Sequence, residues 1–129
     1  MPGPWSKFMR GKVRFVRGDV SYATVNVDIL ETSEEHQRGL MHWTSLPENE
    51  GALFEMGFRD YHAFWMKNTK IPLDLIFIDG DWVVGVLTLA PLDERKHRSN
   101  PSTRVLEVRG GWAKIYGVCL GDRAIVTRA

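Results

Sequence analysis

Hydrophobic and polar residues alternate along much of the chain, a pattern typical of β-strands with one buried face. In residues 22–29, three aliphatic side chains alternate with three polar ones. We therefore predict a strand there, preceded by a short strand over residues 13–16 and a turn at residues 17–19. One face of the longer strand is expected to contact water.

The most hydrophobic part of the chain lies in two runs, residues 71–78 and 82–89, separated by Asp-Gly-Asp. A tight turn between two strand-like runs predicts a β-hairpin, and its apolar content places it at the centre of the core. Shorter runs rich in β-branched or aromatic residues predict further strands. These are residues 53–54, 62–66, 105–108 and 123–127.

Capping signals predict two short helices. Thr32 and Glu35 form a capping box, which predicts a helix over residues 36–41 directly after it. Residues 112–116 predict about one helical turn, closed by Gly117 in the left-handed conformation. Both helices are too short to form a layer of their own.

Polar segments with Pro and Gly predict an irregular loop over residues 43–52, a turn at 57–60 and a mobile surface loop over 90–104. Helices and strands do not alternate in the long units that a parallel sheet needs. The expected fold class is α+β: a strongly bent, mostly antiparallel β-sheet or partial barrel with one or two short helices. A basic N-terminal arm, residues 1–12, precedes a single domain over residues 13–129.

Composition and charge narrow the choice of partners. The chain has 129 residues, 17 of them basic and 16 acidic, so no overall field attracts nucleic acid or an anionic membrane. Its first seventeen residues include several basic residues and no acidic one, which suits a solvated terminus or a contact with an anionic partner. One cysteine, no secretory leader and no membrane-length apolar run predict a cytoplasmic protein without disulfides.

Three groups of motifs are distinctive: Gln37–Met41 with Thr44–Pro47 and Gly51, Phe64–Thr69 with Ile71–Asp74 and Phe77–Asp79, and Val105–Val108 with Gly121–Asp122. Together they resemble the domain of unknown function 192 family of small bacterial and archaeal proteins. The similarity spans residues 25–126 and implies the family's fold, with no activity attached to it. Two positions depart from the family pattern: Trp43 stands where an arginine is usual, and Ala52 where a methionine is usual. The first removes a charge that could pair with a carboxylate.

Asp74 is the first candidate for chemistry, because its neighbours on both faces of the predicted strand are apolar. A carboxylate in such surroundings needs a donor or a cation. The sequence offers Arg38, His62, Lys67 and Asn68 as partners. The carboxylate either ties a turn to the sheet or takes part in binding or acid–base chemistry.

Trp65 is the second candidate, since it stands with Lys67 and Asn68 at the end of a predicted strand. Alternation sends Trp65 and Lys67 to one face and Phe64, Met66 and Asn68 to the other. The Trp65 ring either belongs to the core or forms a platform for a sugar, a base or a peptide.

Other reactive residue types give weaker signals. The four histidines are scattered and the single Cys119 lies between Val118 and Leu120, so we expect no metal site, no cofactor and a buried, inert thiol. Gly110 and Gly111 precede the second helix and predict a tight turn, with an anion-binding nest as the alternative.

Three functions fit these observations. The first is a small ligand-binding or accessory module with a cleft near residues 65–74, using Arg38, Trp65, Lys67, Asn68 and Asp74. The second is a small hydrolase with Asp74 or Glu107 as general base and Lys67 or Arg38 holding an anion. The third is a protein-interaction domain. An Asp74 open to a pocket beside a second titratable group favours the enzyme, whereas an Asp74 sealed by backbone donors favours the module.

Overall fold

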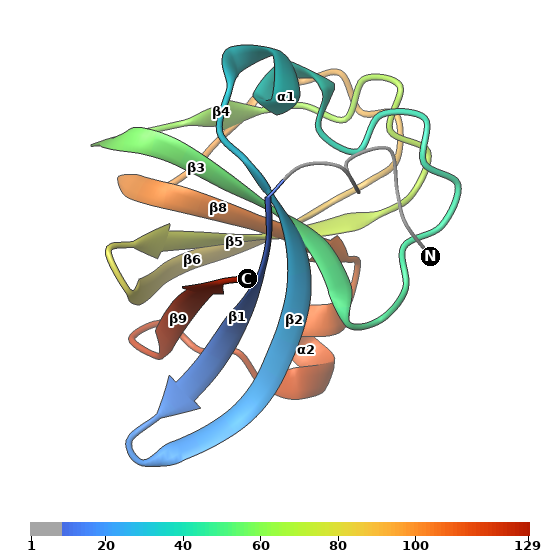
Figure 1. The fold of residues 1–129 in the computed structure, drawn as a ribbon. Coiled ribbons are helices and arrows are strands. Elements are labelled where there is room, and N and C mark those ends of the chain that lie inside the picture. Colours follow the sequence, from blue (N-terminus) through green and yellow to red (C-terminus); the bar gives the residue numbers. More distant parts are fainter. Residues whose placement is uncertain (1–8) are drawn as a thin grey trace.

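A computed structural model describes residues 9–129, whose main feature is a sheet closed into a ring (Figure 1). In the described chain the ring runs β1–β2–β3–β8–β5–β6–β9, and β1 pairs with both β2 and β9. The bonded neighbours are antiparallel except for β2 and β3. The bounds are β1 Arg10–Arg17, β2 Val20–Leu30, β3 Glu50–Asp60, β5 Leu73–Asp79, β6 Trp82–Leu89, β8 Ser102–Arg109 and β9 Arg123–Arg128.

This architecture confirms the expected strand-rich fold with a strongly bent, mostly antiparallel sheet and short helices. The ring is closed rather than partial, since Trp82 of β6 pairs with Arg123 of β9. β1 begins at Arg10, so residues 10–12 of the predicted basic arm lie in the barrel, and the arm before residue 9 is outside the described residues. Among residues 9–129, no helix combines the length and the apolar character needed to cross a bilayer.

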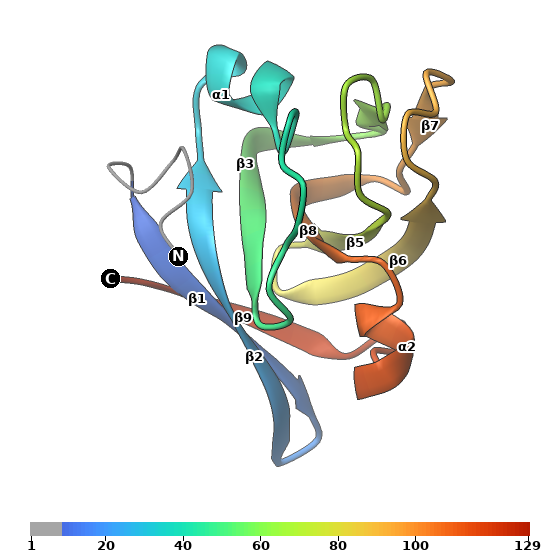
Figure 2. The same cartoon turned by 90° about the vertical axis from the view of Figure 1, so that its right-hand side faces the viewer.

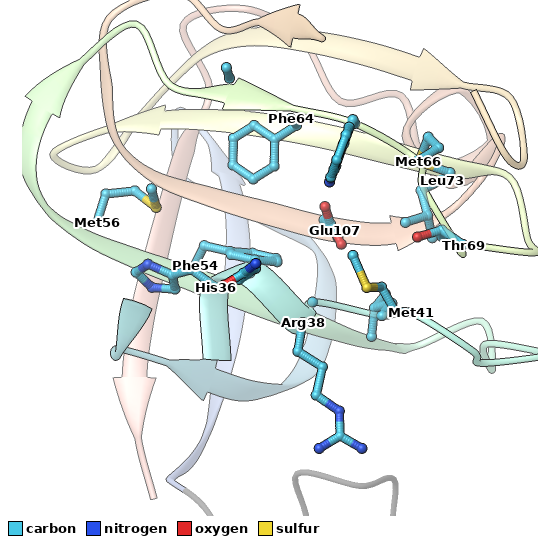
Figure 3. Close-up of a pocket in the computed structure, with 15 residues that line it drawn as sticks. His36, Arg38, Met41, Phe54, Met56, Phe64, Met66, Thr69, Leu73 and Glu107 are labelled. Carbon is cyan, nitrogen blue, oxygen red and sulfur yellow. The ribbon is translucent and has the colours of Figure 1, made fainter. Parts of the chain in front are cut away.

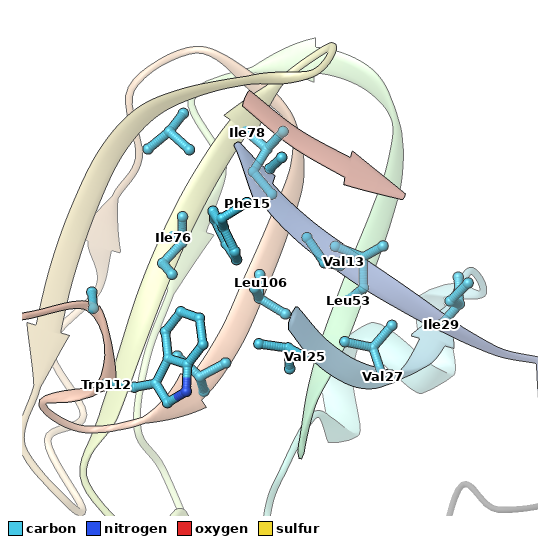
Figure 4. Packing of buried hydrophobic residues seen from close by; sticks show 14 residues of the cluster. Val13, Phe15, Val25, Val27, Ile29, Leu53, Ile76, Ile78, Leu106 and Trp112 are labelled. Carbon is cyan, nitrogen blue, oxygen red and sulfur yellow. The ribbon is translucent and has the colours of Figure 1, made fainter. Parts of the chain in front are cut away.

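The interior of the barrel holds the first hydrophobic core, formed by inward side chains from every strand of the ring (Figure 4). Trp112 of helix α2 (Trp112–Tyr116) fills one end, with its ring centroid 5.5 Å from that of Phe15. The alternation along β5 assigns Ile76 and Ile78 to this core. Burying such large side chains is the main source of stability in a domain of this size.

A second core covers the outer surface of β3, β8 and β5. The other face of β5 supplies Leu73, Leu75 and Phe77, which pack against Leu40 and Met66 from segments outside the barrel. Helix α1 (Ser33–Arg38) and the two-stranded ribbon of β4 (Ala63–Phe64) and β7 (His97–Arg98) belong to this side, away from α2 (Figure 2). The sheet therefore separates two apolar layers.

Helix α1 keeps its predicted cap but not its predicted bounds. The Thr32 side chain accepts from the Glu35 backbone and the Glu35 side chain accepts from the Thr32 backbone, as expected of a capping box. The helix nevertheless starts at Ser33 and ends at Arg38, because the N-cap Thr32 directly precedes its first residue and Gly39 ends it at a φ of 48°. The expected helix over residues 36–41 was placed too late.

Strand pairing corrects three predicted loops. The predicted loop over residues 43–52 ends early, because β3 begins at Glu50 and pairs with β2. Residues 57–60 form the end of β3 rather than a turn, since Asp60 pairs with Ser102 after a bulge. The predicted surface loop over residues 90–104 contains β7 and the first residues of β8. His62 is buried against this segment, and its Nε2 donates to the Ser102 carbonyl at 2.9 Å. These pairings join residues far apart in sequence, which local turn signals do not reveal.

Candidate functional site

A pocket of about 230 Å³ opens between α1 and the outer surface of the sheet (Figure 3). Apolar side chains line most of it, among them Phe54 and Met56 of β3, Phe64 of β4, Met41 and Met66. Its polar lining consists of His36, Gln37 and Arg38 of α1, with Trp65, Thr69 and Glu107 from the other segments. A small apolar hollow with a few polar groups is the usual form of a ligand site.

Glu107 is the unusual member of this lining. It lies on β8 between Ala52 of β3 and Leu75 of β5, and it is 6% exposed. Figure 3 shows its carboxyl group in the middle of the pocket, among Phe54, Phe64 and Met41. No residue in the described range 9–129 makes a hydrogen bond or an ion pair with this carboxyl group. Burial raises the pKa of Glu107 to about 8, because removal from water disfavours the charged form.

Backbone hydrogen bonds hold the walls of the pocket in place. The chain turns at Gly39, and His42 N–H then donates to the Asn68 carbonyl at 2.8 Å. This hydrogen bond joins the segment that follows α1 in sequence to the turn that follows β4. Asn68 adopts a φ of 56°, and Thr69 N–H donates to the Met66 carbonyl at 3.0 Å. Asn68 thus shapes the turn that carries Met66 and Thr69 into the pocket.

The structure separates the predicted site residues. Arg38 and Trp65 line the pocket, and the Trp65 side chain is 37% exposed at its rim. The Lys67 ammonium lies 5.2 Å from the centre of the Trp65 ring, outside the lining. Asp74 belongs elsewhere: it is next to Leu75 on β5, so its side chain points to the opposite face of the sheet from Glu107.

Asp74 is buried at 1% exposure, as the apolar pattern predicts, but its predicted partners are wrong. Its carboxylate accepts from the Thr88 hydroxyl at 2.7 Å and from the backbone N–H groups of Gly111 at 3.1 Å and Ala113 at 2.9 Å. The donors at Gly111 and Ala113 belong to the start of α2. Asp74 therefore caps the helix that closes the barrel, and its donors come from residues too distant in sequence to be foreseen.

The hydrogen bond to Asp74 explains the glycine at position 111, and the approach of Pro72 explains the glycine at position 110. Gly111 has a φ of 90° at the start of α2, a conformation that favours glycine, and it points its N–H at Asp74. A Cβ on Gly110 would lie 2.9 Å from Pro72. The predicted tight turn thus holds a carboxylate of the chain itself.

Cys119 contradicts the expectation of a buried thiol. Both Cys119 and Leu120 are exposed, because the segment behind α2 follows the surface rather than the core. Nearby, Asp122 is buried and accepts from Arg17, from the Tyr22 hydroxyl and from the Cys119 backbone N–H. Its hydrogen bonds to Arg17 hold the pKa of Asp122 well below its usual range.

Trp43, the departure from the family pattern, lines a small second hollow with Asp28 and Glu50. Arg10 of β1 supplies the cation there, since its guanidinium donates to both carboxylates. Within residues 9–129, His, Cys, Asp and Glu side chains form no cluster of three or more that could hold a metal ion.

The sequence does not predict that one acidic residue and four apolar residues form a single pocket. These residues are Glu107, Met41, Met56, Phe54 and Phe64. The available signal was a single acidic residue inside the apolar strand of residues 105–108. It suggested Glu107 as a base, but not the pocket around it. The stretches that carry the family resemblance include Gln37–Met41, Phe64–Met66, Thr69, Leu73 and Glu107, all of which line this pocket.

Comparisons with known proteins agree with the fold. The model of the domain of unknown function 192 family, described as "Uncharacterized ACR", matches residues 14–126 and confirms the resemblance. A Novosphingobium aromaticivorans protein of unknown function is 32% identical, with a TM-score of 0.87 over 97% of this chain and 91% of that one. A Sinorhizobium meliloti protein provisionally named a transcription regulator is 28% identical, with a TM-score of 0.87 over 92% and 95%. No curated protein matches the chain.

Proposed function

Since the chain belongs to the domain of unknown function 192 family, which is described as uncharacterised, we propose from its site that it is a small-molecule-binding module. The ligand occupies the pocket between α1 and the outer surface of β3, β8 and β5, and Glu107 is its polar anchor. The observation that carries this proposal is a carboxyl group that is 6% exposed, faces a cavity and has no partner in residues 9–129. Buried polar groups in folded proteins are nearly always paired, so such a group indicates a missing partner.

The arrangement of the two buried carboxyl groups supports a binding module over a hydrolase. Asp74 lines a hollow at the start of α2, but acid–base catalysis also requires a second titratable group within hydrogen-bond reach. Asp74 instead accepts from Thr88 and from two backbone N–H groups of α2. Glu107 lies on the opposite face of the sheet, so the two carboxyl groups do not share a site.

A thermal-shift screen against a metabolite library tests the proposal, because a ligand bound by the folded state alone raises the unfolding midpoint. Ala63→Trp is the blocking variant: Ala63 lines the pocket and is exposed at its mouth, so a large ring there obstructs entry without entering the core. Ser21→Trp, an exposed position on the β1–β2 hairpin, is the matched control.

We expect at least one compound to raise the midpoint of the wild type and of Ser21→Trp, and not that of Ala63→Trp. A shift that persists in Ala63→Trp places the ligand elsewhere and refutes the proposal. A screen in which no compound stabilises the wild type also counts against it.

A further inference from the structure

The polar groups directed into the pocket are mainly hydrogen-bond acceptors. In its ionised form Glu107 offers two accepting oxygens, and the Thr69 hydroxyl donates to the Lys67 carbonyl at 3.3 Å, which leaves its oxygen free to accept. The thioether sulfurs of Met41, Met56 and Met66 are weak acceptors. A ligand that satisfies this lining must therefore supply donors.

The two basic residues of the lining, His36 and Arg38, direct their donors to other partners or other directions. His36 Nε2 lies 2.7 Å from the Leu30 carbonyl, so this nitrogen donates outside the pocket. Figure 3 shows the Arg38 guanidinium extending away from Glu107. His36, Arg38 and Glu107 are the titratable groups of the lining, and Glu107 alone is aimed at its centre.

Aromatic rings favour a positive charge at the same place. Phe54 and Phe64 meet edge to face with centroids 5.5 Å apart, and both line the pocket beside Glu107. Ring faces attract ammonium groups, and the Trp65 ring at the rim already has the Lys67 and Lys96 ammonium groups 5.2 and 6.0 Å from its centre. A buried carboxylate is tolerated when an opposite charge meets it.

We infer that the ligand is a compact organic ammonium ion, whose N–H groups donate to Glu107 and whose hydrocarbon part packs against Phe54, Phe64 and Met41. This inference rests on the proposed function and names its ligand class. The pocket of about 230 Å³ is small for a ligand site, which favours a short chain or a single ring.

Binding of such a cation is coupled to the proton on Glu107. Below pH 8 the buried carboxyl group is protonated, because burial raises the pKa of Glu107 to about 8. The ammonium ion requires the ionised form, so each binding event releases up to one proton at pH 6 and almost none at pH 9. Affinity should rise about tenfold per pH unit up to pH 8 and then level off.

Isothermal titration calorimetry with hexylammonium as the probe tests this inference, with hexanoate and hexan-1-ol as ligands of similar shape but different charge. Titrations in buffers of different ionisation enthalpy measure the protons released. Glu107→Gln keeps the shape of the side chain and removes the charge. Glu34→Gln, an exposed position on α1 outside the lining, is the matched control for net charge.

We expect the wild type and Glu34→Gln to bind hexylammonium at least tenfold more tightly than hexanoate, with proton release at pH 6. Glu107→Gln should lose both the preference and the proton release. Equal or tighter binding of hexanoate or hexan-1-ol, blocked by Ala63→Trp, refutes the ammonium inference but supports a binding pocket. Hexylammonium binding that Glu107→Gln does not weaken, or no binding of any probe, also refutes the inference, and the library screen then decides the proposed function separately.

Discussion

Replacing Asp74 by Ala should lower the free energy of unfolding by about 2–4 kcal/mol. The carboxylate accepts from Gly111 N–H at 3.1 Å, Ala113 N–H at 2.9 Å and the Thr88 hydroxyl at 2.7 Å. Thr88 is exposed, so its hydroxyl turns to water at little cost. The Ala113 hydrogen bond is buried and the Gly111 hydrogen bond is partly buried, and each donor left without a partner costs about 1–3 kcal/mol. Removing the carboxylate also ends the cost of its own desolvation, which places the expected value in the lower half of the summed range of about 2–6 kcal/mol.

Urea titration of the wild type, Asp74→Ala and Asp79→Ala measures this effect. Asp79 ends the same strand and accepts from Arg59, whose side chain is 62% exposed. Such a surface pair contributes under about 1 kcal/mol, so Asp79→Ala controls for loss of a carboxylate from β5. Asp74→Asn keeps one acceptor and should fall between the two variants.

A loss of stability in Asp74→Ala no greater than in Asp79→Ala would refute the capping role of Asp74. If the hydrogen bonds to α2 matter, the near-ultraviolet circular dichroism of Trp112 should also change, because this ring is held by the helix that Asp74 caps. A variant of full stability that loses binding of a compound found in the screen would instead make Asp74 a functional residue.

Other contacts lead to four further expectations. Asp122→Ala should cost about 2–4 kcal/mol in urea titration, because it strands the Tyr22 hydroxyl and the Cys119 N–H; a cost near zero contradicts this. Gly51→Ala should lower the thermal midpoint by the equivalent of about 1–3 kcal/mol, because the new Cβ would lie 2.4 Å from the Glu107 carbonyl oxygen. Cys119 is exposed and should react with a thiol reagent in the folded protein at close to the rate of the unfolded chain; slow labelling would contradict the exposed position of its thiol. Between the ordinary pKa of 4.5 and about 8 only the folded state keeps the Glu107 proton, so stability should fall as pH rises, by up to about 1.4 kcal/mol per pH unit. The difference in unfolding free energy between the wild type and Glu107→Gln isolates this slope, and a difference independent of pH contradicts it.

The regular part of the fold could be predicted because it depends on local alternation. β5 illustrates this: Leu73, Leu75 and Phe77 enter one core, while Ile76 and Ile78 enter the other, as a period of two requires. The hairpin of β5 and β6 follows from its turn, and the left-handed Gly117 after α2 follows from the absence of a side chain.

The irregular part could not be predicted, because it depends on pairings between distant residues. Asp60 extends β3 because Ser102 is available opposite it, and the Gly-Phe-Arg sequence before Asp60 indicates a turn when read alone. Likewise, Cys119 has apolar neighbours in sequence but lies on the surface, since the chain leaves the core after Gly117.

The candidate site was predicted in part. Residues 65–74 and Arg38 were expected to enclose a cleft, and Arg38 and Trp65 do line the pocket. The sequence favours Asp74 as the functional carboxylate because both faces of its strand are apolar, but its side chain lies on the face that leads into the barrel and to α2. Sequence shows that a carboxylate is buried, not which of two cores receives it.

Glu107 and Asp74 together show how one sheet gives two carboxylates opposite roles. Both lie in apolar strands that are buried on both faces, and their positions on adjacent strands differ by one residue in register, Asp74 opposite Val108 and Leu75 opposite Glu107. That single step sends Asp74 into the closed barrel, where three donors satisfy it, and Glu107 to the outer core, where no described residue does. Leucine or methionine at position 107 would complete the outer core without a desolvation cost, so packing alone does not account for a carboxyl group there. A position that departs from the demands of packing is typical of a functional site, which is the physical reason for placing the ligand at Glu107.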